Sequence, residues 1–180
     1  MDVMKNPEEA VDRYGILVYR LALAQTKNPD DAEDVFQEVF LRLVRSRHSF
    51  DSEEHLKAWL IRVTVNCSCS LWRTVLRRGE IPVGNEAFSG ENTQPTDEHS
   101  EVYDGVMRLP SKYRTVIHLY YYEGMPIESI GAALKIGYSA AAKRLSRARQ
   151  LLKQELTEGE YNEEHPDRIL GNCQHAAHSK

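Results

Sequence analysis

The stretch IESIGAALKIGYSAAAKRLSRARQLL, residues 127–152, holds two helical patterns separated by a short turn. In the first pattern, Gly131 and Ala132 are small enough to let a second helix cross closely. The second pattern places four small or apolar residues on one face at about 100° per residue: Ala141, Leu145, Ala148 and Leu152. A short helix, a turn and a longer helix with a small apolar face predict a helix-turn-helix.

The opposite face of the second helix is small at its start and basic further along. Its candidates for DNA contact are Ser139, Ala140, Lys143, Arg144, Arg147 and Arg149. Small residues let a helix approach base edges in the major groove, and cations reach bases or phosphates. The helix is therefore a candidate DNA-reading element; considered alone, it is equally typical of a solvated basic face.

Charge is distributed unevenly along the chain. The 180 residues have a formal net charge of −4. Residues 59–78 nevertheless carry four arginines and no acid, and residues 105–154 carry nine bases and two acids. Between these blocks, residues 79–104 carry seven acids and no base. Because a nucleic-acid footprint is a local property, the net acidity does not exclude DNA binding.

Helical periodicity also dominates the first part of the chain, and strand-like alternation is hard to find. Residues 8–26 predict a helix, with Val11 and Ile16 in its apolar stripe. In the next helix, Asn28 can cap the N-terminus and Pro29 suits the first position. Its apolar residues repeat every four positions: Val35, Phe36, Val39, Phe40, Leu43 and Val44. A third helix is expected from about Glu54 to Arg78.

These patterns predict an all-α protein with two small helical domains joined by a flexible acidic linker. The first domain covers residues 1–78. The linker covers residues 79–100, where glycine, proline and acidic residues are frequent. The helix-turn-helix domain covers residues 101–157, with Tyr120, Tyr121 and Tyr122 expected to pack inside it. A polar tail covers residues 158–180.

The helix before the linker has a polar face of its own. Its members recur every three or four residues: Arg62, Asn66, Ser70, Arg73 and Arg77. Arginine and asparagine with Trp72 beside them suit a partly single-stranded nucleic acid, through phosphate contacts and base stacking. The alternative is an exposed basic face, with Trp59 and Trp72 in the core.

Other features of the sequence exclude several classes of protein. Three cysteines are too few and too scattered for a disulfide framework, which favours a reducing cytoplasm. No apolar run is long enough to span a membrane, so no membrane insertion is expected. Nucleotide-binding and nucleophile motifs are lacking, and no cofactor is expected. The tail residues His165, Cys173, His175 and His178 lack the usual spacing of a zinc site, and no metal is expected.

Three stretches together resemble the extracytoplasmic-function (ECF) sigma factors, small bacterial RNA polymerase subunits. DAEDVFQEVFLRLVR, residues 31–45, resembles the core-binding helix of sigma region two. AWLIRVTVNCSCSLWR, residues 58–73, resembles the promoter-melting helix of that region. LPSKYRTVIHLYYYEGMPIESIGAAL, residues 109–134, resembles region four together with the opening stretch. The three occur in the family's order, on both sides of a linker.

The resemblance implies a protein that binds core RNA polymerase and directs it to promoters without catalysis of its own. Four residues would face the clamp helices of the polymerase β′ subunit: Asp34, Gln37, Glu38 and Leu41. The second domain would contact the β flap, with the last helix in the major groove of the minus-thirty-five element. An anti-sigma factor is a further expected partner.

The resemblance also implies a minus-ten site on the third helix and the loop before it. Its residues would be His48, Phe50, Asp51, Arg62, Asn66, Arg73 and Arg77. Such a site captures an unstacked base, which stacking and a shaped pocket stabilise outside the duplex.

The sequence departs from the family pattern at the turn and in the reading helix. Lys135 stands where glycine is usual in the turn, and Ala142 stands where lysine is usual. Two other functions remain open at this point: a stand-alone helix-turn-helix regulator with a sensory first domain, and a helical interaction protein without a nucleic-acid role. The helix around Asp34 and Glu38 distinguishes the first of these from a sigma factor, because only a sigma factor needs it to bind polymerase.

Overall fold

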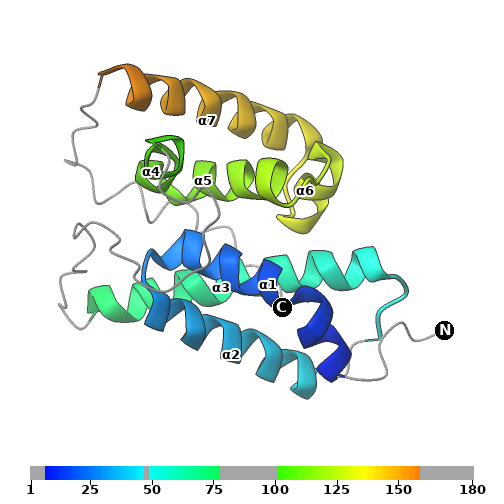
Figure 1. The fold of residues 1–180 in the computed structure, drawn as a ribbon. Coiled ribbons are helices and arrows are strands. Elements are labelled where there is room, and N and C mark those ends of the chain that lie inside the picture. Colours follow the sequence, from blue (N-terminus) through cyan, green and yellow to red (C-terminus); the bar gives the residue numbers. More distant parts are fainter. Residues whose placement is uncertain (1–6, 47–48, 78–100, 159–180) are drawn as a thin grey trace.

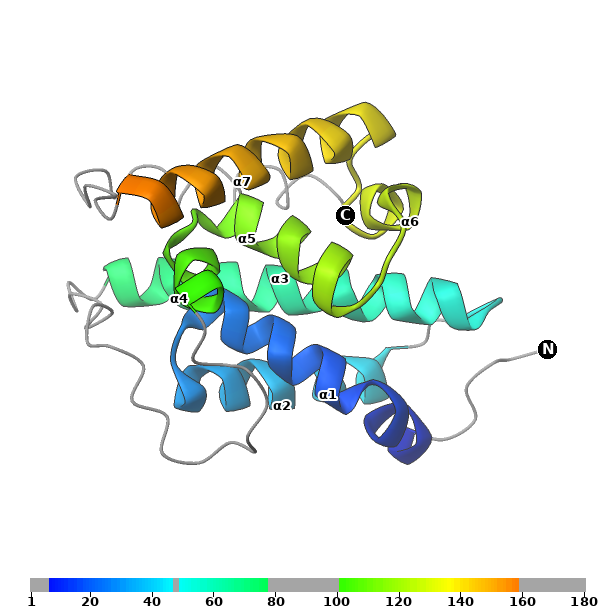
Figure 2. The ribbon, with the colours of Figure 1, turned by 45° about the horizontal axis from the view of Figure 1, so that its top comes forward.

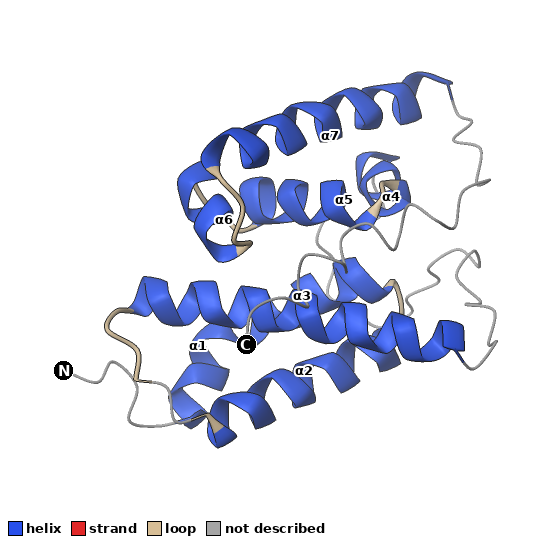
Figure 3. Cartoon of the chain, turned by 180° about the vertical axis from the view of Figure 1, so that it is seen from behind, coloured by secondary structure: helices blue, strands red, loops and turns tan. Residues whose placement is uncertain are grey.

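The computed structural model describes residues 7–46, 49–77 and 101–158, and all the regular structure in these ranges is helical (Figures 1 and 3). The elements are α1 (Pro7–Thr26), α2 (Pro29–Arg45), α3 (Glu53–Arg77), α4 (Glu101–Arg108), α5 (Ser111–Ile117), the π-helix η1 (His118–Tyr122), α6 (Ile127–Ala133) and α7 (Tyr138–Glu158). The all-α prediction is confirmed for the described ranges. The predicted linker and the tail beyond Glu158 lie outside them.

Helices α1, α2 and α3 pack together around an apolar core that includes Val18, Leu21 and Leu60. The start of α2 forms as its sequence predicts. The Asn28 side chain accepts a hydrogen bond from the Asp31 amide at 3.1 Å, and proline occupies the first turn. This cap satisfies a backbone donor that has no partner inside the helix.

Three residues of the predicted apolar stripes are exposed instead of buried. Ile16 is 68% exposed, Val44 is 60% exposed and Val11 is 37% exposed. Each of these residues lies on a side of its helix that no neighbouring helix covers. Consecutive side chains of an α-helix point in directions about 100° apart. Val44 therefore faces solvent, although Leu43 next to it faces the core.

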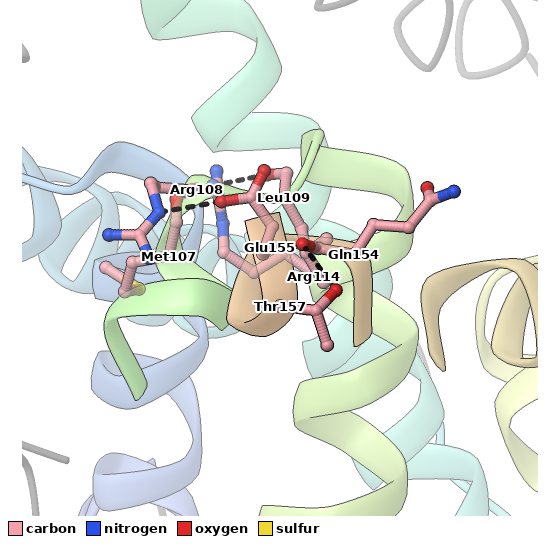
Figure 4. A network of polar contacts seen from close by, with 7 residues as sticks. All are labelled: Met107, Arg108, Leu109, Arg114, Gln154, Glu155 and Thr157. Atoms are coloured by element: carbon pink, nitrogen blue, oxygen red, sulfur yellow. Dashed lines mark hydrogen bonds and ion pairs between the residues drawn. The ribbon is translucent and has the colours of Figure 1, made fainter. Parts of the chain in front are cut away.

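Helices α4 to α7 form a second packed group, in which α7 lies across α5 and α6. Gly105 in α4 allows a close approach to the end of α7, because a Cβ atom there would lie 2.9 Å from Leu152 Cδ1. Next to it, the Arg108 Nε donates to the Glu155 carboxylate at 2.8 Å (Figure 4). The Glu155 side chain is only 1% exposed, so this ion pair fixes α4 to α7.

The turn between α6 and α7 explains two residues of the opening stretch. Gly131 lies against the turn itself, since a Cβ atom there would be 3.0 Å from the Ile136 carbonyl oxygen. Ala132, expected at the helix crossing, is exposed, and Ala133 is buried in its place. Lys135 has a positive φ of 53°, a conformation that favours glycine.

The helix after Pro110 does not remain a regular α-helix up to Gly124. It widens into η1, where the Glu123 amide donates to the His118 carbonyl oxygen at 3.2 Å, five residues earlier. Tyr120 is half-buried, whereas Tyr121 and Tyr122 are 57% and 47% exposed. The expectation that all three tyrosines pack inside is therefore wrong, because the extra residue of a π-turn rotates the following side chains.

The two groups of helices lie against each other, with α5 and α6 between α7 and the pair α1 and α3 (Figures 1 and 2). Helix α5 contacts α1, and α6 contacts α3. Residues separated by 70 or more positions in the sequence are thus brought within hydrogen-bond distance.

Candidate nucleic-acid interface

Helix α7 has the two faces that its sequence predicts. Ala141, Leu145 and Ala148 are fully or almost fully buried against the rest of the second group. Ser139, Ala140 and Lys143 are exposed on other sides of the helix, as are Arg147 and Arg149. No acidic residue occurs in α7 before Glu155, so the first four turns of the helix present an uncompensated positive surface.

The three arginines of α7 differ in their surroundings. Arg147 is exposed and donates to the Gln150 side chain at 3.2 Å. Arg149 donates to the Tyr121 hydroxyl at 2.8 Å, and its guanidinium lies 5.3 Å from the Tyr120 ring centroid. Arg144 is half-buried beside α5, and this burial lowers its pKa. Arg147 therefore faces outward, while Arg144 and Arg149 lie on the two flanks of the helix.

Tyr121 also belongs to this surface, although the sequence did not predict it there. It reaches the flank of α7 because η1 turns it outward, and it restrains the Arg149 guanidinium in one position. Tyr121 and Arg149 are 28 positions apart in the sequence, so helical periodicity does not predict their contact.

The polar face of α3 is partly covered. Arg62, Asn66 and Arg73 are half-buried. The Arg62 guanidinium donates to the carbonyl oxygens of Ala133 at 3.2 Å and Ala132 at 3.3 Å, and burial lowers the pKa of this arginine. The side chain of Arg77 lies outside the described residues. Of this face, Arg62 is thus directed at α6 in the structure.

The loop before α3 places its two described candidates differently. Phe50 is 2% exposed and packs edge-on against Trp59, with ring centroids 5.7 Å apart. It therefore belongs to the core in this structure and does not reach the surface as expected for a base contact. Asp51 is exposed, with its carboxylate 4.0 Å from His55 Nδ1. His48 lies outside the described residues.

The outer face of α2 carries the four residues that the resemblance assigned to polymerase binding. Asp34 and Gln37 are exposed. Leu41 is 47% exposed, and Glu38 accepts a hydrogen bond from Arg42 Nε at 2.6 Å. Val44 continues this face, three residues after Leu41 and seven after Gln37. This spacing indicates that Val44 is exposed, but the apolar residues around it in the sequence favour a buried position.

Other kinds of site were sought among the described residues. No group of three or more histidine, cysteine or acidic residues there could hold a metal ion. Cys67 and Cys69 are buried thiols, and burial raises the pKa of Cys67 to about 11. Within the same ranges, no helix combines the length and the apolar character needed to cross a membrane. The four metal candidates of the tail lie outside the described residues.

Comparison with known proteins gives matches over both groups of helices. Residues 10–78 match the model of sigma-70 region 2, and residues 99–152 match that of sigma-70 region 4. The sigma factor SigM of Bacillus subtilis is 30% identical over 153 residues, which are 81% of this chain and 92% of that protein. SigW of the same organism is 27% identical over 82% of this chain and 87% of its own length. SigE of Mycolicibacterium smegmatis is 30% identical over 83% of this chain, which spans 61% of that relative.

Two solved structures have the same fold. The sigma factor RpoE from Bartonella quintana, solved in complex with the anti-sigma factor NepR, gives a TM-score of 0.68 at 22% identity, covering 88% of this chain and 100% of that one. CnrH, solved with the cytosolic domain of CnrY, gives 0.62 at 23% identity, covering 86% and 89%. The match to region 2 disfavours a stand-alone helix-turn-helix regulator. With region 2 and region 4 both matched, and with 30% identity along most of SigM, the chain belongs to the ECF family of RNA polymerase sigma factors.

Proposed function

We propose that this sigma factor binds core RNA polymerase through α2 and reads promoters through α3 and α7, without catalytic activity of its own. The observation that carries the proposal is the first part of α7, an exposed basic surface without acids, held by a buried face of alanine and leucine. In functional terms, residues 1–78 act as one unit and residues 101–157 as another. Residues 79–100 connect them, and the tail begins at residue 158.

Helix α7 would lie in the major groove at the minus-thirty-five element. Lys143 and Arg147 project outward and would reach base edges, while Ser139 and Ala140 leave room for a close approach. Arg144 and Arg149 lie on the flanks and would contact phosphates on either side of the groove. Ala142 stands where relatives usually have a lysine, so Lys143 takes a larger share of the contact.

The minus-ten strand would bind along α3, on Arg62, Asn66 and Arg73, with Arg77 and the loop residues His48 and Asp51 beside them. Phosphate contacts by arginine provide affinity that is independent of sequence. Phe50 supports this loop from the core, and does not itself stack on a base, because it packs against Trp59.

Three protein partners follow from the family. The outer face of α2 would bind the clamp helices of the polymerase β′ subunit, through Asp34, Gln37, Glu38 and Leu41. The second unit would contact the β flap. An anti-sigma factor is the third partner. RpoE was solved in complex with the anti-sigma factor NepR, and CnrH was solved in complex with the cytosolic domain of CnrY.

Reconstituted transcription tests the proposal. Purified core polymerase with this protein is expected to start transcripts at defined sites, and mapping those starts gives both promoter elements. Arg147→Ala is expected to lower transcript yield at least about fivefold, the loss of one base contact. Arg168→Ala in the predicted tail is the matched control and should change little. Equal losses in the two variants would contradict the assignment of α7.

Core binding is tested separately by charge reversal on α2. The double variant Asp34→Lys and Glu38→Lys is expected to weaken binding to core polymerase, measured by fluorescence anisotropy without DNA. Asp12→Lys together with Asp104→Lys, two exposed acids outside α2, controls for the same change in net charge. A protein that fails to bind core polymerase at all would overturn the proposed function.

A further inference from the structure

The contact between the two groups of helices covers a surface that the proposed function needs. Arg62, proposed to hold the minus-ten strand, instead donates to two carbonyl oxygens of α6, those of Ala132 and Ala133. These carbonyls belong to the last turn of α6, where the helix dipole favours a cation. The Ala132 oxygen also accepts from the Lys135 amide at 3.2 Å. The α6 terminus thus occupies Arg62 as a phosphate group would.

A second contact joins the end of α1 to the start of α5 through Gln25. The Gln25 side-chain amide donates to the Thr115 hydroxyl at 2.6 Å, and its carbonyl oxygen accepts from the Ser111 hydroxyl. The Gln25 backbone oxygen also accepts from Arg114 at 3.4 Å. Gln25 and Thr115 are 3% and 1% exposed, so the hydrogen bond between them is shielded from water.

Charge is complementary across the same interface. Glu123, which follows η1, lies 3.6 Å from His118. Contact with His118 lowers the pKa of the Glu123 carboxyl, and the positive charges of Lys57 on α3 and Arg20 on α1 lower it further. The charge of an acid in the second group is therefore stabilised by two bases of the first.

The chemistry of this interface suits a reversible contact. The described links include hydrogen bonds and charge attraction, which water replaces at little net cost. Apolar packing also crosses the interface, because the buried apolar residues of both groups form one continuous cluster. Interfaces between domains of one chain resemble transient protein interfaces, so relative motion of the two groups is expected. The interface also includes Arg62, so the nucleic acid and the second group compete for one side chain.

We propose that the free protein closes on itself, with the helix-turn-helix unit covering the minus-ten face of α3, and that promoter binding requires α6 to leave α3. The partner of this α3 surface is the second half of the same chain. The inference that closure blocks promoter binding rests on the proposed function, because that function assigns DNA contact to Arg62. The closed state itself is a structural claim that is measured without polymerase or DNA.

Small-angle X-ray scattering of the full chain tests closure. Gln25→Leu removes the side chain that forms two hydrogen bonds of the α1–α5 contact. Lys57→Glu replaces a base that stabilises the Glu123 carboxylate with an acid. Neither residue belongs to the proposed binding surfaces. Both variants are expected to raise the radius of gyration by about 3 Å or more, from the value near 16 Å of a compact chain of this length. Gln154→Leu, the same change at an exposed position of α7, should leave the radius unchanged.

Binding of a fluorescein-labelled single-stranded DNA of mixed sequence provides the second readout, measured by anisotropy without polymerase. The opened variants are expected to bind it at least threefold more tightly than the wild type and Gln154→Leu. Far-UV circular dichroism confirms that each variant keeps its helices. Should a variant unfold, the other carries the test, because they act on different contacts.

The outcomes separate this inference from the proposed function. A radius unchanged in both folded variants would overturn self-closure, whatever the protein does in transcription. A larger radius with unchanged DNA binding would equally overturn the competition for Arg62. A larger radius with tighter DNA binding supports self-closure, even if reconstituted transcription were to fail and the proposed function with it.

Discussion

Replacement of Lys135 by glycine is expected to stabilise the protein. Lys135 sits between α6 and α7 with a φ of 53°, and its side chain is exposed. A residue with a Cβ atom in this left-handed conformation costs about 1–2 kcal/mol. Glycine avoids that cost but loses about 0.5–1 kcal/mol more conformational entropy on folding. The difference predicts a gain of about 0.5–1 kcal/mol for Lys135→Gly.

Urea unfolding of the full chain, followed by helical circular dichroism, measures this gain. Lys135→Ala is the matched control, because it removes the charge and the long side chain but keeps the backbone strain. The free energy of unfolding of the glycine variant should exceed that of the alanine variant by the predicted amount. In thermal unfolding, about 1 kcal/mol corresponds to a rise in Tm of about 2–4 °C for a chain of this size.

A reciprocal change strengthens the experiment. Gly124 has a φ of 61°, and a Cβ atom there would meet nothing within 4 Å. Gly124→Ala therefore isolates the backbone cost and should destabilise by a similar amount. If Lys135→Gly were no more stable than Lys135→Ala while Gly124→Ala showed its loss, the strain assigned to Lys135 would be refuted.

Three other predictions follow from described contacts. Glu155→Gln should lower the free energy of unfolding by about 1–2 kcal/mol, measured in urea, because a buried carboxylate loses its charge-assisted bond to Arg108; Glu128→Gln, at an exposed position, should have little effect. Tyr121→Phe should weaken promoter binding about twofold to fivefold at unchanged stability, because Arg149 loses its hydroxyl partner. Burial raises the pKa of Cys67 from 9.0 to about 11, so the unfolded thiol ionises first and stability should fall as the pH rises from 9 towards 11; at neutral pH a thiol reagent should modify Cys67 only in urea.

Local chemistry made α2 the most predictable element. The Asn28 cap, the proline after it and the four-residue apolar repeat all concern neighbours on one helix, and each is present in the structure. The same holds for the inner face of α7, where Ala141, Leu145 and Ala148 are buried. The prediction for Val44 was wrong because periodicity shows where the centre of the apolar face lies. It does not show how much of the helix surface the neighbouring helices cover.

Contacts between distant residues could not be read from the sequence. Arg62 and Ala133 are 71 positions apart, and the pattern on α3 indicated a basic face without indicating what lies against it. Phe50 was assigned to DNA by its position in the family, but an aromatic ring in a loop also packs into any core that accepts it. The roles of the polar faces therefore stay predictions until the polymerase and DNA experiments are done.

The π-turn at His118–Tyr122 has a consequence for comparing members of this family. Such a turn holds one residue more than an α-helical turn, and one residue corresponds to about 100° of rotation. Removing a single tyrosine from this segment would remove the extra residue and rotate the side chains that follow it by about that angle relative to α5. The length of the segment thus decides whether a tyrosine reaches the flank of α7, so a one-residue gap in an alignment here would move the partner of Arg149.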